Sequence, residues 1–311
     1  MTSPRKERQG EIWAIGGGKG GTGKTFITSC MGTYLAQKEN RVVLIDVDIG
    51  GANLHSFFGI HKPGKSLTNF FENGSPLQEL TVKTGIDNMQ LISGDVYSLA
   101  SDNIKFTQKL KLFRHITKLN AQYVLIDLGA GSHNNTLDTF LMADKMIAIL
   151  VPEMIAVENM YHFIKNALFR KVKMSLRSYG FREIVEHVWE RRKRYGIRNL
   201  KELIEWLGNS FSYIGDILDQ ELSSFKIYLI LNKVRSPDDI VIGSSMKSAL
   251  LKFLGIDIDF VGYIEYDDSV WRSIRNQQPF MLHYSSSRCT EEIEDFTENL
   301  IQGKEISLLR A

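Results

Sequence analysis

Long hydrophobic runs, paired cysteines and an apolar N-terminal segment are all missing from this sequence. No stretch of about 18 apolar residues occurs, so a transmembrane helix is not expected. The polar start, MTSPRKERQGE, has no apolar core behind its basic residues, which argues against a secretory signal. Cys30 and Cys289 are far apart and lack any CxxC or Cys/His spacing. A disulfide framework or zinc site is therefore not expected, and a reducing cytoplasm fits best.

A strong excess of one charge is also missing from the chain as a whole, but not from one part of it. The 311 residues carry a net charge of +2, and 43% of them are hydrophobic, enough for a sizeable core. The segment 165–201 holds twelve Lys or Arg and three Glu, a net charge of +9. The rest has 26 basic and 33 acidic residues, a net of −7, so the segment's charge is informative about partners.

Short apolar runs alternate with helical patterns along most of the chain. The apolar runs are 12–15, 41–46, 89–93, 123–129, 145–152, 225–233 and 259–264. Helical spacing is clear over 25–37 and 103–119. Continuous apolar strands separated by helices indicate a parallel sheet covered on both faces. We predict one doubly wound α/β domain over 1–311, with its ligands at the carboxyl ends of the strands.

One stretch between two strand patterns is too long for an ordinary crossover. No strand pattern appears from Pro152 to Phe225. The segments 181–195 and 199–208 each repeat apolar residues at the spacing of an amphipathic helix. We predict a helical, basic insertion over 165–222 that packs on the main domain.

A glycine-rich loop follows the first strand pattern and opens the first helix. Within AIGGGKGGTGKTF, the stretch from Gly18 to Thr25 satisfies G-x-x-x-x-G-K-[ST] in the context that this motif requires. Glycines let backbone N–H groups approach phosphate oxygens, and the following helix adds its positive end. Lys24 can reach the β- and γ-phosphates, and the Thr25 hydroxyl suits Mg²⁺. The expected nucleotide-binding residues here are Gly18, Lys19, Gly20, Gly21, Thr22, Gly23, Lys24, Thr25 and Phe26.

A second lysine in the same loop needs its own explanation, because one lysine serves an ordinary phosphate loop. The stretch KGGTGKT, which begins at Lys19, resembles the deviant Walker A motif of the MinD/ParA family of ATPases. The resemblance implies that Lys24 serves the chain's own ATP. It also implies that Lys19 reaches across a nucleotide-sandwich homodimer to the partner's ATP and supplies positive charge in the transition state. The alternative is a solvated loop lysine.

Three further segments resemble the same family. In VLIDVDIGGANLHSFFG, the resemblance implies that Asp46 organises Mg²⁺ and its waters, and that Asp48 positions the attacking water. It further implies that Asn53 senses the nucleotide. In YVLIDLGAG, Asp127 would hold Mg²⁺ through water, and in LNKV, Asn232 would read the adenine edge. A carboxylate at a strand end beside phosphates needs a cation, which supports Mg²⁺ independently.

The resemblance covers 11–164 and 224–300, and it is nearest to the FlhG/FleN-like and MinD-like branch. Glu265 stands where the family usually has a proline, so no base contact is assigned to that loop. The resemblance implies a slow, Mg²⁺-dependent ATPase stimulated by a partner protein. Its ATP-bound homodimer would position or recruit a cellular partner, and hydrolysis would reset it.

Other classes of function share this fold. Metal or iron–sulfur cluster delivery needs paired cysteines at a dimer interface, and here Cys30 and Cys289 are isolated. A P-loop small-molecule ligase normally lacks a partner-facing lysine, which Lys19 argues against. A bacterial tyrosine kinase carries a tyrosine-rich tail, and this tail has only Tyr284.

The partner of the basic insertion stays open at this point. RRKR, residues 191–194, could follow DNA phosphates, face anionic lipid or dock an acidic protein. The plain alternative is a solvated helix face. We expect a cytoplasmic protein that is peripheral on the nucleoid or membrane if the insertion binds either one.

Overall fold

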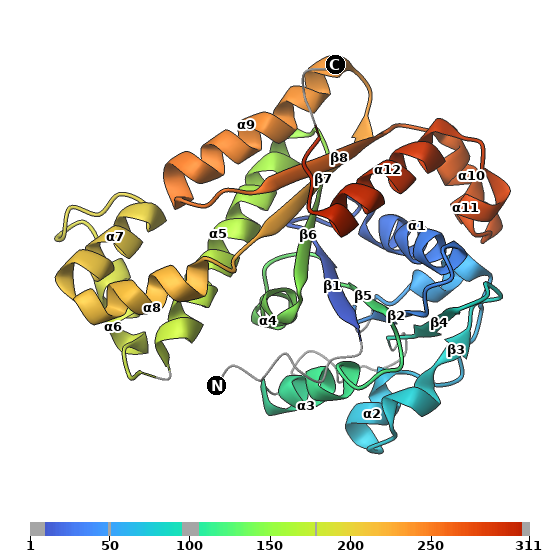
Figure 1. The fold of residues 1–311 in the computed structure, drawn as a ribbon, viewed down its shortest axis with the longest axis horizontal. Coiled ribbons are helices and arrows are strands. Elements are labelled where there is room, and N and C mark those ends of the chain that lie inside the picture. Colours follow the sequence, from blue (N-terminus) through green and yellow to red (C-terminus); the bar gives the residue numbers. More distant parts are fainter. Residues whose placement is uncertain (1–9, 49–50, 95–105, 178, 307–311) are drawn as a thin grey trace.

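A mostly parallel sheet forms the centre of the computed structural model, which describes residues 10–48, 51–94, 106–177 and 179–306 (Figure 1). Its strands are β1 (Glu11–Gly16), β2 (Val42–Asp46), β3 (Val82–Lys83), β4 (Met89–Ile92), β5 (Tyr123–Asp127), β6 (Lys145–Leu150), β7 (Ile227–Val234) and β8 (Asp259–Glu265). Their order is β3-β4-β2-β5-β1-β6-β7-β8, and only the β3–β4 pair is antiparallel in the described residues. The predicted doubly wound fold is confirmed. The sequence does not predict the edge strand β3, because two residues are too few to show a pattern.

Helices cover both faces of the sheet (Figure 1). One face carries α1 (Lys24–Gln37), α10 (Asp268–Asn276), α11 (Phe280–His283) and α12 (Arg288–Gln302). The other carries α2 (Leu67–Glu72), α3 (Phe106–Ile116), α4 (Asn134–Met142), α5 (Met154–Arg177) and α9 (Pro237–Leu254). Successive residues of β1 show the two layers, since Ala14 packs in one core cluster and Trp13 and Ile15 in the other. The first three residues of the predicted helix 103–119 lie outside the described residues.

Helix α1 is buried almost all round. Twelve of its fourteen residues are buried, among them Cys30 at 1% exposure. Such a helix has no polar face, because it lies between the sheet and other helices. Helix α1 therefore gives the glycine-rich loop that precedes it a rigid support.

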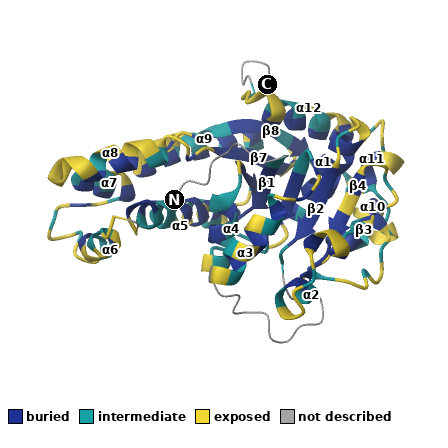
Figure 2. Ribbon diagram, turned by 60° about the horizontal axis from the view of Figure 1, so that its bottom comes forward, coloured by how far each residue is buried: buried dark blue, intermediate teal, exposed yellow. Residues whose placement is uncertain are grey.

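Helix α5 runs past the sheet into a projecting group of helices, here called the arm (residues 182–222; Figures 1 and 2). The arm contains α6 (Arg182–Glu190), α7 (Leu200–Ser210) and α8 (Ser212–Leu222). Its apolar interior is continuous with the core on one face of the sheet, and it is made of Val185, Val188, Ile197, Leu200, Leu203, Leu207, Ile214, Ile217 and Leu218. In the described residues between β6 and β7 there is no strand, as the sequence predicted.

The predicted helix 181–195 is too long. Helix α6 ends at Glu190, and the following residues to Gly196 form turns. Four consecutive basic residues after Glu190 offer no apolar side chain to bury, and like charges along a helix repel. Gly196 has a φ of 70°, which ends any continuation. Nowhere in the described ranges is a helix long and apolar enough to cross a bilayer.

Candidate functional site

The glycine-rich loop is folded tightly between the end of β1 and the start of α1. Gly21 and Gly23 have φ values of 76° and 94°, in the left-handed region that favours glycine. A side chain at Gly18 would come within 2.2 Å of the backbone oxygen of Asn159 on α5. The loop therefore needs glycine both for its turns and for its close approach to α5.

The end of β7 holds the same loop from the other side. Asn232, which is 5% exposed, donates through Nδ2 to the carbonyl oxygen of Thr22 at 2.8 Å. The next residue, Lys233, donates through Nζ to the carbonyl oxygen of Gly21 at 2.9 Å. Lys233 stands within LNKV, but the sequence pattern does not predict its contact with the loop. Adenine recognition by Asn232 stays a prediction.

Lys24 lies in the interior of the site. Its side chain is 7% exposed and donates through Nζ to the carbonyl oxygen of Lys19 at 3.2 Å. Burial lowers the pKa of Lys24, and the carboxylates of Asp127 and Asp48 oppose that shift. A buried ammonium group in a glycine-rich loop that opens a helix is suited to an anion.

Asp46 and Asp127 stand side by side at the carboxyl ends of β2 and β5, where they are partners in the sheet register. Burial raises the pKa of both carboxyls, and in Asp127 the neighbouring Asp46 adds to the rise. The Thr25 hydroxyl donates a hydrogen bond to Asp127, which opposes it. Two buried acids beside each other favour a cation at this edge of the sheet.

Asp46 also organises the loop that follows it. Its carboxylate accepts backbone N–H groups from Asp48 at 3.0 Å, Asn53 at 3.0 Å and Leu54 at 3.1 Å. The loop after β2 is thereby anchored to the strand that carries it. Residues 49 and 50 of the segment lie outside the described residues.

Asp48 brings the loops after β2 and β5 together. A side chain at Gly129 would lie 2.8 Å from Oδ1 of Asp48, so this contact requires glycine. The half-buried carboxyl of Asp48 has a raised pKa because of burial, with Lys24 opposing the rise. Asp48 therefore lies at the same edge as Lys24 and the buried pair Asp46 and Asp127.

A cavity of about 440 Å³ opens beside the glycine-rich loop. It is lined by Gly21, Gly23, Lys24, Thr25, Phe26, Asn53, Phe57, Asn232, Lys233, Ile264, Glu265, Tyr266, Asp267, Val270, Trp271 and Ile274. Five of the nine phosphate-loop candidates thus share one cavity with Asn53 and Asn232, whereas Gly18, Lys19, Gly20 and Thr22 do not line it. The sequence does not predict Tyr266 and Trp271 as lining residues, because the glutamate before them breaks the family pattern.

The site fits a nucleotide with Mg²⁺. The Thr22 hydroxyl is buried and has no hydrogen-bond partner within the described parts of the chain. Those parts also hold no group of three or more His, Cys, Asp or Glu that could bind a metal. Thr25, Asp46 and Asp127 supply only oxygens, which suits Mg²⁺ with phosphate and water as further ligands.

Residues 13–280 match the model of the CobQ/CobB/MinD/ParA nucleotide binding domain. The chain belongs to this family. It is 33% identical over 136 residues to an uncharacterized ATP-binding protein of Methanocaldococcus jannaschii, covering 42% of this chain and 49% of the relative. It is 20% identical over 274 residues to the antiactivator FleN of Pseudomonas aeruginosa, covering 86% and 78%.

The solved structure of the MinC:MinD cell division complex of Aquifex aeolicus has the same fold. It superposes with a TM-score of 0.62 at 20% identity and covers 96% of this chain and 97% of that one. The chain spans about half the length of the first curated relatives, at 49% and 55%. These comparisons establish the MinD/ParA fold and nucleotide-binding domain.

In this MinD/ParA-type domain, the signature Lys19 lies at the rim of the site. Its ammonium group pairs with Glu153 at 2.9 Å, and the side chains are 39% and 57% exposed. That pairing lowers the pKa of Glu153. The next residues along the chain, Met154 and Ile155 of α5, are 84% and 64% exposed. Lys19 thus stands on an apolar, exposed rim, and its role in a partner's site stays a prediction.

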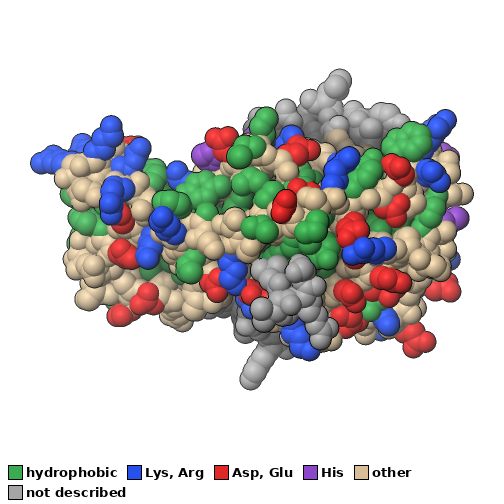
Figure 3. Space-filling model, turned by 90° about the horizontal axis from the view of Figure 1, so that it is seen from above, with side chains coloured by type: hydrophobic (Ala, Val, Ile, Leu, Met, Phe, Trp, Pro, Cys, Tyr) green, Lys and Arg blue, Asp and Glu red, His purple; other side chains and the backbone are tan. Residues whose placement is uncertain are grey.

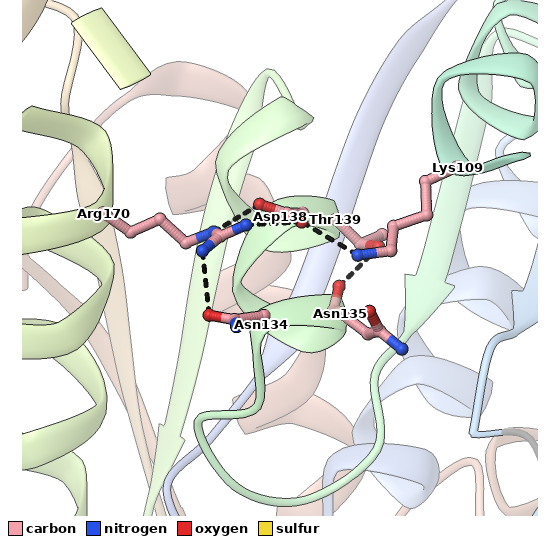
Figure 4. A network of polar contacts seen from close by, with 6 residues as sticks. All are labelled: Lys109, Asn134, Asn135, Asp138, Thr139 and Arg170. Carbon is pink, nitrogen blue, oxygen red and sulfur yellow. Dashed lines mark hydrogen bonds and ion pairs between the residues drawn. The ribbon is translucent and has the colours of Figure 1, made fainter. Parts of the chain in front are cut away.

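A buried charge network links α3, α4 and α5 (Figure 4). Asp138 of α4, which is 1% exposed, accepts from Nζ of Lys109 on α3 at 2.9 Å and from Nη2 of Arg170 on α5 at 2.9 Å. Arg170 also donates to Oδ1 of Asn134 at 2.8 Å. The carboxylate of Asp138 therefore joins three helices. It belongs to α4, the helix that follows the loop after β5. The pattern of the sequence did not predict this network.

Proposed function

We propose that this chain is a Mg²⁺-dependent ATPase that dimerises when ATP is bound and separates after hydrolysis. The observation that carries the proposal is the pair of lysines in one loop. Lys24 is buried among the acids, whereas Lys19 stands at the exposed rim. The ammonium group of Lys19 pairs with Glu153 at this rim. From there it is suited to contact the nucleotide site of a neighbouring chain.

Each residue then has a distinct task. The loop from Gly18 to Phe26 holds the phosphates with backbone N–H groups, and Lys24 balances their charge. Thr25, Asp46 and Asp127 hold Mg²⁺, which when bound neutralises charge on the phosphates. Asp48 orients the attacking water. Asn53 and Asn232 contact the nucleotide on the far side of the loop.

The dimer would act as a switch that recruits or positions a cellular partner, with a partner protein accelerating slow hydrolysis. Support comes from relatives whose names describe septum-site determination and antiactivation. We propose a cytoplasmic protein that becomes peripheral where its partner is placed. We also propose that 165–222 is a helical insertion within one P-loop domain.

Cluster delivery and ligase activity are less well supported. Cys30 and Cys289 are 1% and 2% exposed, on α1 and α12. Neither thiol reaches a surface where two chains could share a metal cluster. Burial also raises the pKa of both thiols, which disfavours the thiolate that binds metal.

The test is the mass of the protein in solution with ATP, with ADP and without nucleotide. An Asp48→Ala variant, which would block turnover, should be dimeric with ATP and monomeric otherwise. A protein that is monomeric under all three conditions would refute the dimerisation switch. If that monomer still hydrolysed ATP, the ATPase part of the proposal would stand and the switch would not.

A further inference from the structure

Ion pairs offset part of the basic charge that the sequence places in 165–201. Four of the basic residues pair with acids from outside that segment. These pairs are Arg170 with Asp138, Lys171 with Glu221, Arg198 with Glu202, and Lys201 with Glu205. Lys173 pairs with Glu186 inside it. Counting these four acids with the segment lowers its net charge from +9 to +5.

One part of the basic segment keeps its charge. Arg191, Lys193 and Arg194 are exposed in the turn after α6, here called the basic turn. Within the described residues, none of the three forms an ion pair with a carboxylate. Figure 3 shows Lys and Arg side chains gathered at the end of the arm.

An apolar groove borders the basic turn. The groove has a volume of about 380 Å³ and is lined by Glu183, Ile184, His187, Val188, Tyr195, Trp206 and Phe211. Trp206 lies between two other rings, with centroids 4.9 Å from Tyr195 and 6.5 Å from Phe211. Phe211 is 43% exposed. The basic turn connects two lining residues, His187 and Tyr195, and Arg191 contacts the His187 ring at 2.9 Å.

We propose that this groove docks an acidic, amphipathic segment of another protein. A bulky apolar side chain of the segment enters the groove, and carboxylates beside it pair with the basic turn. Aromatic and arginine side chains are the residues that most often dominate binding energy at protein interfaces. This proposal specifies the class of partner for the recruiting function proposed above, and it rests on that function.

The shape and charge of the surface favour a protein segment over the two other polyanions. A DNA backbone presents phosphates and sugars, and its bases are stacked inside the duplex, so it has no bulky apolar group to fill an aromatic groove. A bilayer is bound by the continuous apolar face of an amphipathic helix, whereas the apolar residues of this groove come from two helices, α6 and α7, and from the loops beside them. Glu183 at the groove and the exposed Glu190 would also face a uniformly anionic surface. A peptide can place its acidic side chains beside the basic turn and away from Glu183 and Glu190.

The experiment selects a random dodecapeptide display library on the immobilised full chain. We expect enriched peptides to combine an aromatic or leucine residue with neighbouring Asp or Glu. The triple variant carries Arg191→Glu, Lys193→Glu and Arg194→Glu. We expect synthetic copies of the peptides to bind it about tenfold more weakly than the wild type. The single variant Ile184→Glu, which changes the groove, should weaken peptide binding by a similar factor. Rising salt should weaken binding to the wild type.

The matched control reverses three exposed lysines elsewhere, Lys38→Glu, Lys83→Glu and Lys118→Glu. It changes net charge equally and should bind the peptides as the wild type does. The proposal is overturned if enriched peptides lack acids or an apolar anchor, or if the control weakens binding as much as the triple variant.

Two further measurements separate this proposal from its rivals and from the ATPase switch. The first is binding of duplex DNA and of anionic vesicles. If the wild type binds either of these but no peptide, and the triple variant abolishes that binding, the proposal is overturned in favour of a nucleic acid or lipid surface. ATP-dependent dimerisation should be unchanged in the triple variant. A wild type that fails to dimerise would instead refute the switch, whatever the peptides do.

Discussion

At the residue scale, Asp48 and Asp127 face the same site from different surroundings. Asp48 is half-buried between two loops, whereas Asp127 is buried at a strand end. We predict that Asp48→Ala binds ATP but hydrolyses it about a hundredfold more slowly, because water loses its orienting carboxylate. Single-turnover hydrolysis measures this change, and hydrolysis at the wild-type rate would show that Asp48 has another role.

Asp127→Ala should act on the metal instead. We predict that Mg²⁺-dependent ATP affinity falls about tenfold or more, as expected for a carboxylate that holds metal through water. Titration of a fluorescent ATP analogue with and without Mg²⁺ measures it. Equal losses under both conditions would place Asp127 in folding and not at the metal.

The buried pair also predicts a pH dependence. Burial and the neighbouring Asp46 raise the pKa of Asp127 above its ordinary value, so the folded nucleotide-free chain holds a proton that the unfolded chain has released. The carboxyl therefore costs stability as pH rises above the ordinary range of an aspartic acid. Asp127→Asn, which cannot ionise, should gain thermal stability relative to the wild type as pH rises. A difference that does not change with pH, measured without nucleotide, would contradict this account.

At the scale of elements, Asp138 joins α3, α4 and α5. Its side chain is 1% exposed, and those of Lys109 and Arg170 are 10% and 24% exposed. We predict that Asp138→Ala lowers the free energy of unfolding by about 3 to 5 kcal/mol, because two cations lose their buried partner. Urea unfolding measures it. Arg198→Ala, which removes an exposed pair with Glu202, is the control and should have little effect.

Helix α5 connects the nucleotide site with the arm. Its first turn carries the exposed rim beside Lys19, and Asn159 packs against Gly18. Further along, Asn166 donates to the Ser132 hydroxyl at 3.1 Å, and Arg170 pairs with Asp138. The helix therefore contacts the phosphate loop and the loop after β5, and the arm follows its carboxyl end.

At the scale of the whole molecule, the two lysines should separate binding from assembly. We predict that Lys24→Ala loses nucleotide affinity by about tenfold or more, because a buried charge facing phosphate is removed. Lys19→Ala should keep most of its affinity but stay monomeric with ATP and lose hydrolysis. Nucleotide titration and solution mass measure both, and a Lys19→Ala dimer with normal turnover would assign that lysine to the surface.

The sequence by itself determined the fold class and most of the candidate site. A strand, a glycine-rich loop and a helix follow one another within a few residues, so local rules suffice to place Lys24 and Thr25. Asp46 and Asp127 end apolar strands, and parallel strands bring such ends to one edge of a sheet. The register of β2 and β5 then makes the two acids neighbours, as that rule requires.

Only the tertiary structure decided which distant groups meet. Lys233 reaches the glycine-rich loop from the end of β7, and Tyr266 and Trp271 line the cavity because β8 and α10 fold beside that loop. Two of the carboxylates that pair with the segment 165–201, Asp138 and Glu221, likewise come from distant parts of the chain. A count along the chain cannot include such partners, because pairing energy depends on distance in space and not on separation in sequence.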